Sequence, residues 1–217
     1  MINNLPQYFH DEVVQVRRDL HKIPEIAFRE TKTSEYIQNF LKVNDIEYQA
    51  NIAKTGVIAE IKGEKTGPNV LGLRADIDGL PINEETNLIF KSDNGNMHAC
   101  GHDGHIAIML ISLKYLKSIQ NEISGILRVI FQPAEEEIGG AKVMLKEKPE
   151  LFDDITHMFG FHIWNQIETG KIAFNDSTVF VSADTFEIEI YGKGGHGAMP
   201  HLNIDPIFIG ANLIVSA

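Results

Sequence analysis

The sequence predicts an α/β fold, with helices flanking a sheet, followed by the start of a smaller second domain. Short apolar runs of strand length alternate with longer segments whose apolar residues recur at helical spacing. The pattern changes near residue 183, where strict alternation of apolar and acidic residues begins. The chain has 217 residues, of which 43% are hydrophobic, and this is enough to bury a core.

Three segments have the periodicity of helices. Residues 8–22 place apolar side chains at roughly helical spacing, and the pattern stops before Pro24. Residues 33–44 predict a second amphipathic helix. Residues 105–119 are long and apolar at the same spacing, which predicts a buried helix.

Four segments predict strands. They are rich in β-branched or other apolar residues and lie at residues 56–63, 69–78, 125–133 and 156–165. Because open α/β folds place their sites at the carboxyl edge of the sheet, the residues that follow these strands are candidates for function.

The second domain is expected to begin at residue 183, which divides the chain into 1–182 and 183–217. Residues 186–190 alternate between apolar and acidic side chains, the pattern of a half-exposed antiparallel strand. Residues 203–217 predict a helix with Asp205 as its N-cap and Pro206 at its first position.

The composition excludes several classes of protein. The net charge of −11, from 19 Lys and Arg against 30 Asp and Glu, argues against nucleic acid as a partner. No apolar run reaches the roughly 18 residues that a membrane span requires, and the N-terminus lacks the pattern of a signal peptide. A single cysteine rules out an intrachain disulfide, so we expect a cytoplasmic setting.

The segment NMHACGHDGH, residues 96–105, contains the only cysteine and three of the nine histidines. If the backbone is extended there, Cys100 and His102 face the same side and can reach one centre. Thiolate and imidazole are good ligands for zinc and similar metals. The alternative is a buried thiol beside surface histidines.

The segment FQPAEEEIGGA places three adjacent glutamates directly after a predicted strand. Neighbouring carboxylates repel one another unless a cation neutralises them. One of them can then bind metal while the next holds the attacking water, as metal-assisted hydrolysis requires. The alternative is a solvated acidic turn.

Further candidates also lie at predicted strand ends. His162 lies at the end of an apolar run, and Asp76 and Asp78 lie two residues apart on one face. The aspartates are expected to orient a histidine ligand, or else to serve the turn that follows them. The glycines of GKGGHGAMPH have neither the spacing of a P-loop nor that of a dinucleotide fingerprint, which argues against nucleotide binding.

Taken together, these motifs resemble one family. The matching segments are DLHKIPE, LRADIDGLPI, MHACGHDGHIA, FQPAEEEIGGA, GFHIWN and GKGGHGAMPHLNIDPI, in this order over residues 19–207. They resemble the metal-dependent amidohydrolases of the aminoacylase and carboxypeptidase superfamily, in the branch with hippurate hydrolases, indole-acetyl-amino-acid hydrolases and N-acetyldiaminopimelate deacetylases. The resemblance implies a mixed sheet flanked by helices, as in zinc exopeptidases, in an incomplete catalytic domain, and the start of an α+β lid.

The resemblance also implies roles for individual residues. The metal ligands would be Cys100, as a thiolate that bridges two ions, and His102, Glu136 and His162. Glu135 would act as general base and then general acid. His196, in the lid, would steady the oxyanion.

The implied reaction is hydrolysis of the amide bond of N-acyl amino acids, with two divalent ions, zinc or manganese, as cofactors. The lid would join copies of the chain into a homo-oligomer, without nucleic acid or membrane as partners. Family members are longer and contribute one more histidine ligand. Two hypotheses therefore stay open: an active amidohydrolase, or a catalytically inactive metal-binding chain with only an association role.

Overall fold

A computed structural model describes residues 6–137, 139–174, 176 and 185–216. The chain divides into two compact units, Met1–Gln166 and Ile167–Ala217. The predicted domain boundary between residues 182 and 183 falls within 177–184, outside the described residues.

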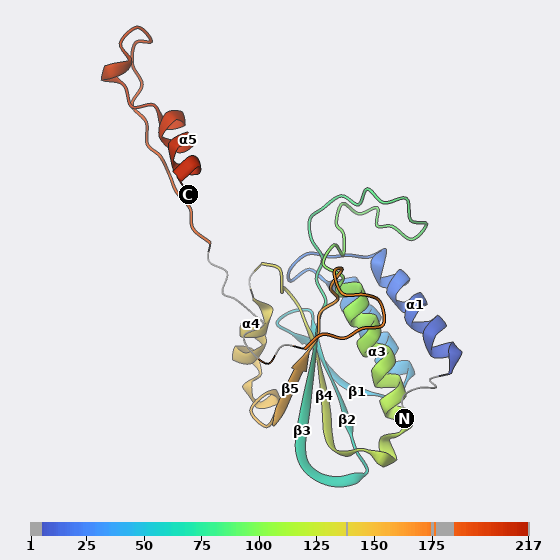
Figure 1. Cartoon of the computed structure of the whole chain (residues 1–217). Coiled ribbons are helices and arrows are strands. Elements are labelled where there is room, and N and C mark those ends of the chain that lie inside the picture. The colour runs from blue at the N-terminus through green and yellow to red at the C-terminus, as the bar shows by residue number, and fades with distance from the viewer. Residues whose placement is uncertain (1–5, 138, 175, 177–184, 217) are drawn as a thin grey trace. The chain divides into compact units, whose positions relative to one another are not determined.

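The first unit is built on a mixed five-stranded sheet. Its strands are β1 Glu47–Ile52, β2 Gly56–Lys62, β3 Lys65–Asp76, β4 Ser124–Gln132 and β5 His157–Gly160. They lie in the order β1-β2-β4-β3-β5 (Figure 1). β3 runs parallel to β4 and β5, whereas β2 is antiparallel to β1 and β4. The expected sheet with mixed strand directions is confirmed.

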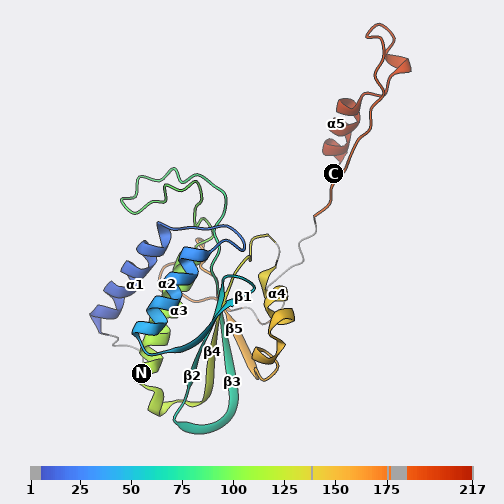
Figure 2. The ribbon, with the colours of Figure 1, turned by 180° about the vertical axis from the view of Figure 1, so that it is seen from behind.

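Helices cover both faces of this sheet. The helices of the first unit are α1 Gln7–His21, α2 Thr31–Val43, α3 His102–Ser118 and α4 Gly140–Glu147. The first three lie on one face and α4 lies on the other, as both views show (Figures 1 and 2). Successive residues of β2 point to opposite faces, so Val57 and Ala59 pack in the larger core with α1–α3. Ile58, between them, packs with Met144 of α4.

The structure corrects the predicted backbone around the cysteine motif. The helix predicted over 105–119 begins earlier, so His102 is its first residue. Gly101 has a φ of 87°, a left-handed conformation that glycine adopts without steric cost. The expectation of an extended backbone from Cys100 to His102 is therefore wrong, because the chain turns at Gly101 and enters α3.

Other differences concern short elements. The sequence patterns missed β1, which lies at the sheet edge and has mostly polar or exposed residues, and the eight-residue helix α4. The strand predicted over 156–165 is shorter, since β5 ends at Gly160, before His162.

The parallel strands determine where a site can form. The carboxyl ends of β3, β4 and β5 lie at one edge, because Asp76 pairs with Gln132 and Arg74 pairs with Gly160. The segments that follow these three strands therefore leave the sheet side by side.

The second unit contains a bridge between Lys193 and Ile204 and the helix α5 Pro206–Ser216. The predicted N-cap is confirmed, since Asp205 Oδ1 accepts a hydrogen bond from the backbone N–H of Ile207 at 2.9 Å. The strand predicted from the alternating pattern over residues 186–190 is wrong, because these residues form no ladder with another described segment. The pattern sorts side chains onto two faces but does not supply a partner strand. In the described part of the chain, no helix is long and apolar enough to cross a membrane.

Candidate metal centre

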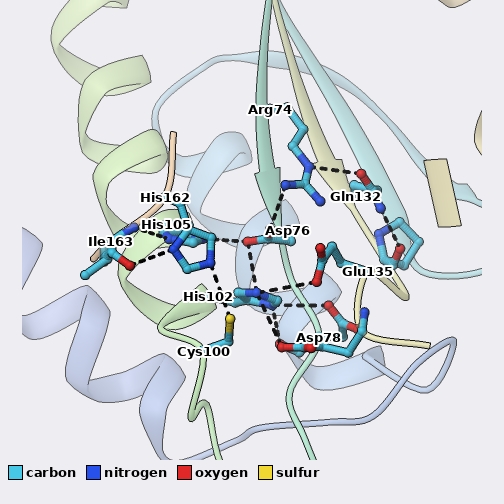
Figure 3. A network of polar contacts seen from close by, with 12 residues as sticks. Arg74, Asp76, Asp78, Cys100, His102, His105, Gln132, Glu135, His162 and Ile163 are labelled. Atoms are coloured by element: carbon cyan, nitrogen blue, oxygen red, sulfur yellow. Dashed lines mark hydrogen bonds and ion pairs between the residues drawn. The ribbon is translucent and has the colours of Figure 1, made fainter. Parts of the chain in front are cut away.

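Five of the residues predicted to act in the site lie together at the carboxyl edge of the sheet. Cys100 precedes α3 and His102 begins it, the two glutamates follow β4, and His162 follows β5 (Figure 3). Two groups of side chains have ligand atoms within 4.8 Å of one another. The groups are Cys100, His102 and His162, and His102, Glu135 and Glu136. His102 belongs to both, so the two groups form one cluster.

The distances in the cluster leave room for a cation between the donors. Cys100 Sγ lies 3.3 Å from His162 Nε2. His102 Nε2 lies 3.7 Å from Glu136 Oε1 and 3.9 Å from Glu135 Oε2.

Hydrogen bonds fix which nitrogen of each imidazole is free. His102 Nδ1 lies 2.9 Å from the carbonyl oxygen of Asp78 and 3.2 Å from its Oδ1, so Nδ1 carries the proton and donates it. His162 Nδ1 likewise donates to the carbonyl oxygen of Ile163 at 2.6 Å. Both rings then turn Nε2, the nitrogen that remains for a metal ion, towards the cluster. The expected contact between Asp78 and a histidine of the cluster is confirmed.

Unpartnered polar atoms show that the cluster fits a divalent cation. His102 Nε2 and Glu136 Oε1 are buried and have no hydrogen-bond partner among the described residues. A buried polar atom left without a partner costs about 1–3 kcal/mol, so such an arrangement calls for an explanation. Thiolate, imidazole and carboxylate form a donor set that suits zinc and related ions.

The electrostatics of the cluster also favour a cation. Burial, together with the charges of Glu136 and Glu135, raises the pKa of the Cys100 thiol to about 12. Burial and the nearby carboxylates of Glu135 and Asp78 raise the pKa of Glu136, despite the opposing effect of His102. A bound divalent ion reverses both effects, because it displaces the proton of a coordinating thiol and neutralises the carboxylates.

A third group, Asp76, His102 and His105, adjoins the cluster and is fully buried. Asp76 Oδ1 lies 2.6 Å from His105 Nδ1, and its Oδ2 lies 2.8 Å from Arg74 Nη1 (Figure 3). Burial opposes ionisation of Asp76, but the hydrogen bond with His105 and the charges of His102 and Arg74 outweigh it and lower its pKa to about 2. Asp76 is therefore a carboxylate already occupied by two partners.

Two carboxylates hold the segment that carries the glutamates. The backbone N–H of Glu136 donates to Asp78 Oδ2 at 3.0 Å, and that of Ala134 donates to Glu30 Oε1 at 2.9 Å. Glu30 is completely buried and also accepts the hydroxyl of Thr55 at 2.6 Å. Glu30 lacked any signal in the sequence, because it lies far from the motif and beside no other candidate.

Two residues of the predicted motifs have other surroundings. Asp103 contacts α1, where it accepts hydrogen bonds from His21 Nδ1 at 2.7 Å and Arg17 Nε at 2.8 Å. His196 lies in the second unit, and its Nδ1 accepts the backbone N–H of Ala198 at 3.1 Å.

A cavity of about 800 Å³ adjoins the candidate ligands Cys100 and His162. Its wall includes Val13 of α1, Phe90 and Trp164. The cluster is therefore open on one side to a largely apolar space within the first unit.

Comparisons with known proteins agree with this geometry. Residues 72–211 match peptidase family M20/M25/M40. The chain is 43% identical to N-acetylcysteine deacetylase of Bacillus subtilis over 95% of its own length and 54% of that protein. It is 40% identical to N-acyl-L-amino acid amidohydrolase of Geobacillus stearothermophilus over 99% of its length and 58% of that protein. The chain thus spans about half the length of the curated relatives it matches.

A solved structure is similar as well. The YXEP protein of Bacillus subtilis, described as a dinuclear metal-binding peptidase of the M20 family, is 44% identical, with a TM-score of 0.68 over 73% of this chain and 44% of that one. The length of the match over residues 72–211 and the shared fold lead to one conclusion. The chain belongs to peptidase family M20/M25/M40.

Proposed function

We propose that the chain carries the metal-binding part of a hydrolase that cuts the amide bond of N-acyl amino acids, giving a carboxylic acid and a free amino acid. The observation that carries this proposal is the buried Nε2 of His102, which has no hydrogen-bond partner among the described residues and lies where the two ligand groups meet. The names of the deacetylase and amidohydrolase relatives support the substrate class.

In this proposal the ligands of two divalent ions, zinc or manganese, are Cys100, His102, Glu136 and His162, with Cys100 shared. When bound, the ions supply Lewis-acid activation of water and of the scissile carbonyl. Glu135 has a more exposed side chain than Glu136, 39% against 18%, which supports our proposal that it takes a proton from water and returns it to the leaving amine. His196 is proposed to donate a hydrogen bond to the oxyanion.

A metal-binding role without catalysis is the second candidate. Four ligands with one shared thiolate make five metal–protein bonds, whereas two catalytic zinc ions with about three protein ligands each need about six. This shortage of one bond, counted over the described residues, is the observation that favours a metal-binding role without catalysis.

The setting of the protein is also part of the proposal. The single cysteine supports the cytoplasm, and the net charge of −11 argues against nucleic acid as a partner. Association of copies through the second unit is supported by α5, where Ile207 and Ile214 are each about 80% exposed.

The test is hydrolysis of hippurate and N-acetyl amino acids by the complete gene product that contains this sequence. After dialysis against a chelator we expect no turnover, and added zinc or manganese should restore it. Glu135→Gln serves as the control, because it should bind metal without turnover. Hydrolysis that continues unchanged after the metal has been removed would contradict the proposal.

A further inference from the structure

We propose that His105 is a positioning residue, which holds the segment after β5 so that His162 faces Cys100. This inference rests on the proposed metal centre, and it assigns a task to a histidine that does not itself bind an ion. The side chain of His105 is 1% exposed, and it lies one helical turn after His102 in α3.

The hydrogen bonds of His105 determine its protonation. The backbone N–H of Ile163 lies 2.9 Å from His105 Nε2, and because a backbone N–H can only donate, Nε2 must accept (Figure 3). The proton of the neutral ring is then on Nδ1, which donates to Asp76 Oδ1 at 2.6 Å. Asp76 is held in turn by Arg74, so the orientation of the ring is set from the sheet.

The contact with Ile163 bears directly on His162. The N–H of Ile163 is bound to His105, while its carbonyl oxygen accepts the proton of His162 Nδ1 at 2.6 Å. Ile163 therefore joins the two imidazoles, and its orientation decides where His162 Nε2 points. In the structure this nitrogen points to Cys100 Sγ, 3.3 Å away.

Regular structure does not hold this segment. β5 ends at Gly160, and His162 is exposed and lies beyond the ladder of the sheet. The Ile163 side chain lies over Gly104 of α3, where an added Cβ would lie 2.5 Å from Ile163 Cδ1. The hydrogen bond that the backbone N–H of Ile163 donates to His105, and this close packing against α3, are thus contacts that place the segment.

The same geometry argues against His105 as a metal ligand. His105 belongs to a group with Asp76 and His102, whose ligand atoms lie within 4.8 Å of one another and could therefore surround an ion. Both of its ring nitrogens are already used, however, one by Asp76 and one by the N–H of Ile163.

The experiment compares two substitutions of His105, each of which keeps a different one of its two hydrogen bonds. His105→Asn keeps a donor near Nδ1 for Asp76 and loses the acceptor for Ile163. His105→Gln places an amide oxygen near the position of Nε2 and can keep that acceptor. His10→Asn, at an exposed position of α1, is the matched control. In the complete gene product we measure zinc stoichiometry and affinity by chelator competition, and cobalt–thiolate absorption as a signal of the Cys100 side.

We expect His105→Asn to lower the affinity for one of the two ions by on the order of 10- to 100-fold. The same variant should show a weaker cobalt–thiolate absorption. His105→Gln should lose less of this affinity, and His10→Asn should bind both ions as the wild type does. Wild-type affinity for both ions in His105→Asn would overturn the inference, as would equal loss of both ions together with a lower melting temperature in both His105 variants. A wild-type protein that binds no metal would instead refute the proposed function, on which the inference rests.

Discussion

At the scale of single residues, Cys100 is a thiol among carboxylates, and burial together with these charges raises its pKa to about 12. We predict that Cys100→Ala lowers the bound metal below two ions and abolishes hydrolysis in the complete gene product, because the shared ligand is lost. Metal content after dialysis, measured by mass spectrometry, checks the prediction. A variant with unchanged metal stoichiometry and rate would show that the thiol does not bridge two ions.

The two adjacent glutamates should differ in phenotype. Glu135→Gln should retain metal but lose on the order of 10²-fold or more in kcat, since it removes the proposed general base. Glu136→Gln should lose metal, because an amide is a poorer ligand than a carboxylate. Paired measurements of metal content and kcat test both statements. Near-full kcat in Glu135→Gln would mean that the two roles are assigned wrongly.

Glu30 predicts a dependence of stability on pH. Burial raises its pKa above 4.5, although the hydrogen bonds from Thr55 and Ala134 oppose this. Above pH 4.5 the unfolded chain has lost a proton that the folded chain retains, so the free energy of unfolding falls as pH rises through this window. Glu30→Gln is neutral throughout and keeps an acceptor for Ala134, so its stability relative to the wild type should increase with pH.

Urea unfolding at several pH values between roughly 4.5 and 7 measures this difference. The matched control is Glu122→Gln, at an exposed position. If the difference in free energy of unfolding between Glu30→Gln and wild type stays constant with pH, then Glu30 has the same pKa in the folded and the unfolded chain.

At the scale of elements, the start of α4 limits where the glutamates can lie. A Cβ on Gly140 would lie 1.9 Å from the carbonyl oxygen of Pro133, so Gly140→Ala must displace the segment between them, which carries Glu135 and Glu136. We expect a loss of about 1–3 kcal/mol in the free energy of unfolding, the usual cost of overpacking. A displacement of about 1 Å at these carboxylates should lower kcat by on the order of 10²-fold.

Gly210→Ala in α5 is the matched control for this substitution, because there a Cβ would meet its nearest atom at an ordinary 3.5 Å. Thermal unfolding and kcat are compared for the two variants. Wild-type kcat in Gly140→Ala would mean that the segment tolerates the shift without moving its carboxylates.

Local patterns predicted the elements whose apolar residues repeat strongly, among them α1, α2, β2 and β4. They missed β1 and α4, which are short or polar, and they placed a strand over residues 186–190, where the structure has none. In each case, whether the segment forms a strand or a helix depends on the segment of the fold that it packs against or pairs with. The extended backbone expected from Cys100 to His102 was wrong because one left-handed glycine starts α3.

The candidate ligands were accessible to sequence reasoning because each lies in a short motif that follows a strand or leads into a helix. The residues that support them were not. Arg74 and Gln132 hydrogen-bond to each other at 2.9 Å only because β3 and β4 pair in register. The contact of Glu30 with Ala134 spans 104 positions of sequence, and no local pattern encodes it.

At the scale of the whole molecule, the number of proposed ligands gives a prediction for residues 1–217 expressed by themselves. The four proposed ligands make five metal–protein bonds, and about six are needed for two ions that each have about three protein ligands. We therefore predict that residues 1–217, expressed alone, bind one ion tightly and a second weakly. They should hydrolyse hippurate and N-acetyl amino acids slowly or not at all. Calorimetric titration with zinc or manganese and a hydrolysis assay check both statements.

Two tightly bound ions, with turnover of roughly 1 s⁻¹ or faster, would require a fifth ligand from this same chain. His105 is excluded by its two hydrogen bonds, whereas both ring nitrogens of His98 are buried without partners among the described residues. Burial lowers the pKa of His98 to about 4, so its ring is neutral and has a free lone pair at neutral pH. His98 belongs to none of the ligand groups within the described residues, so it would have to move to bind. Loss of the second ion in His98→Ala would then identify it.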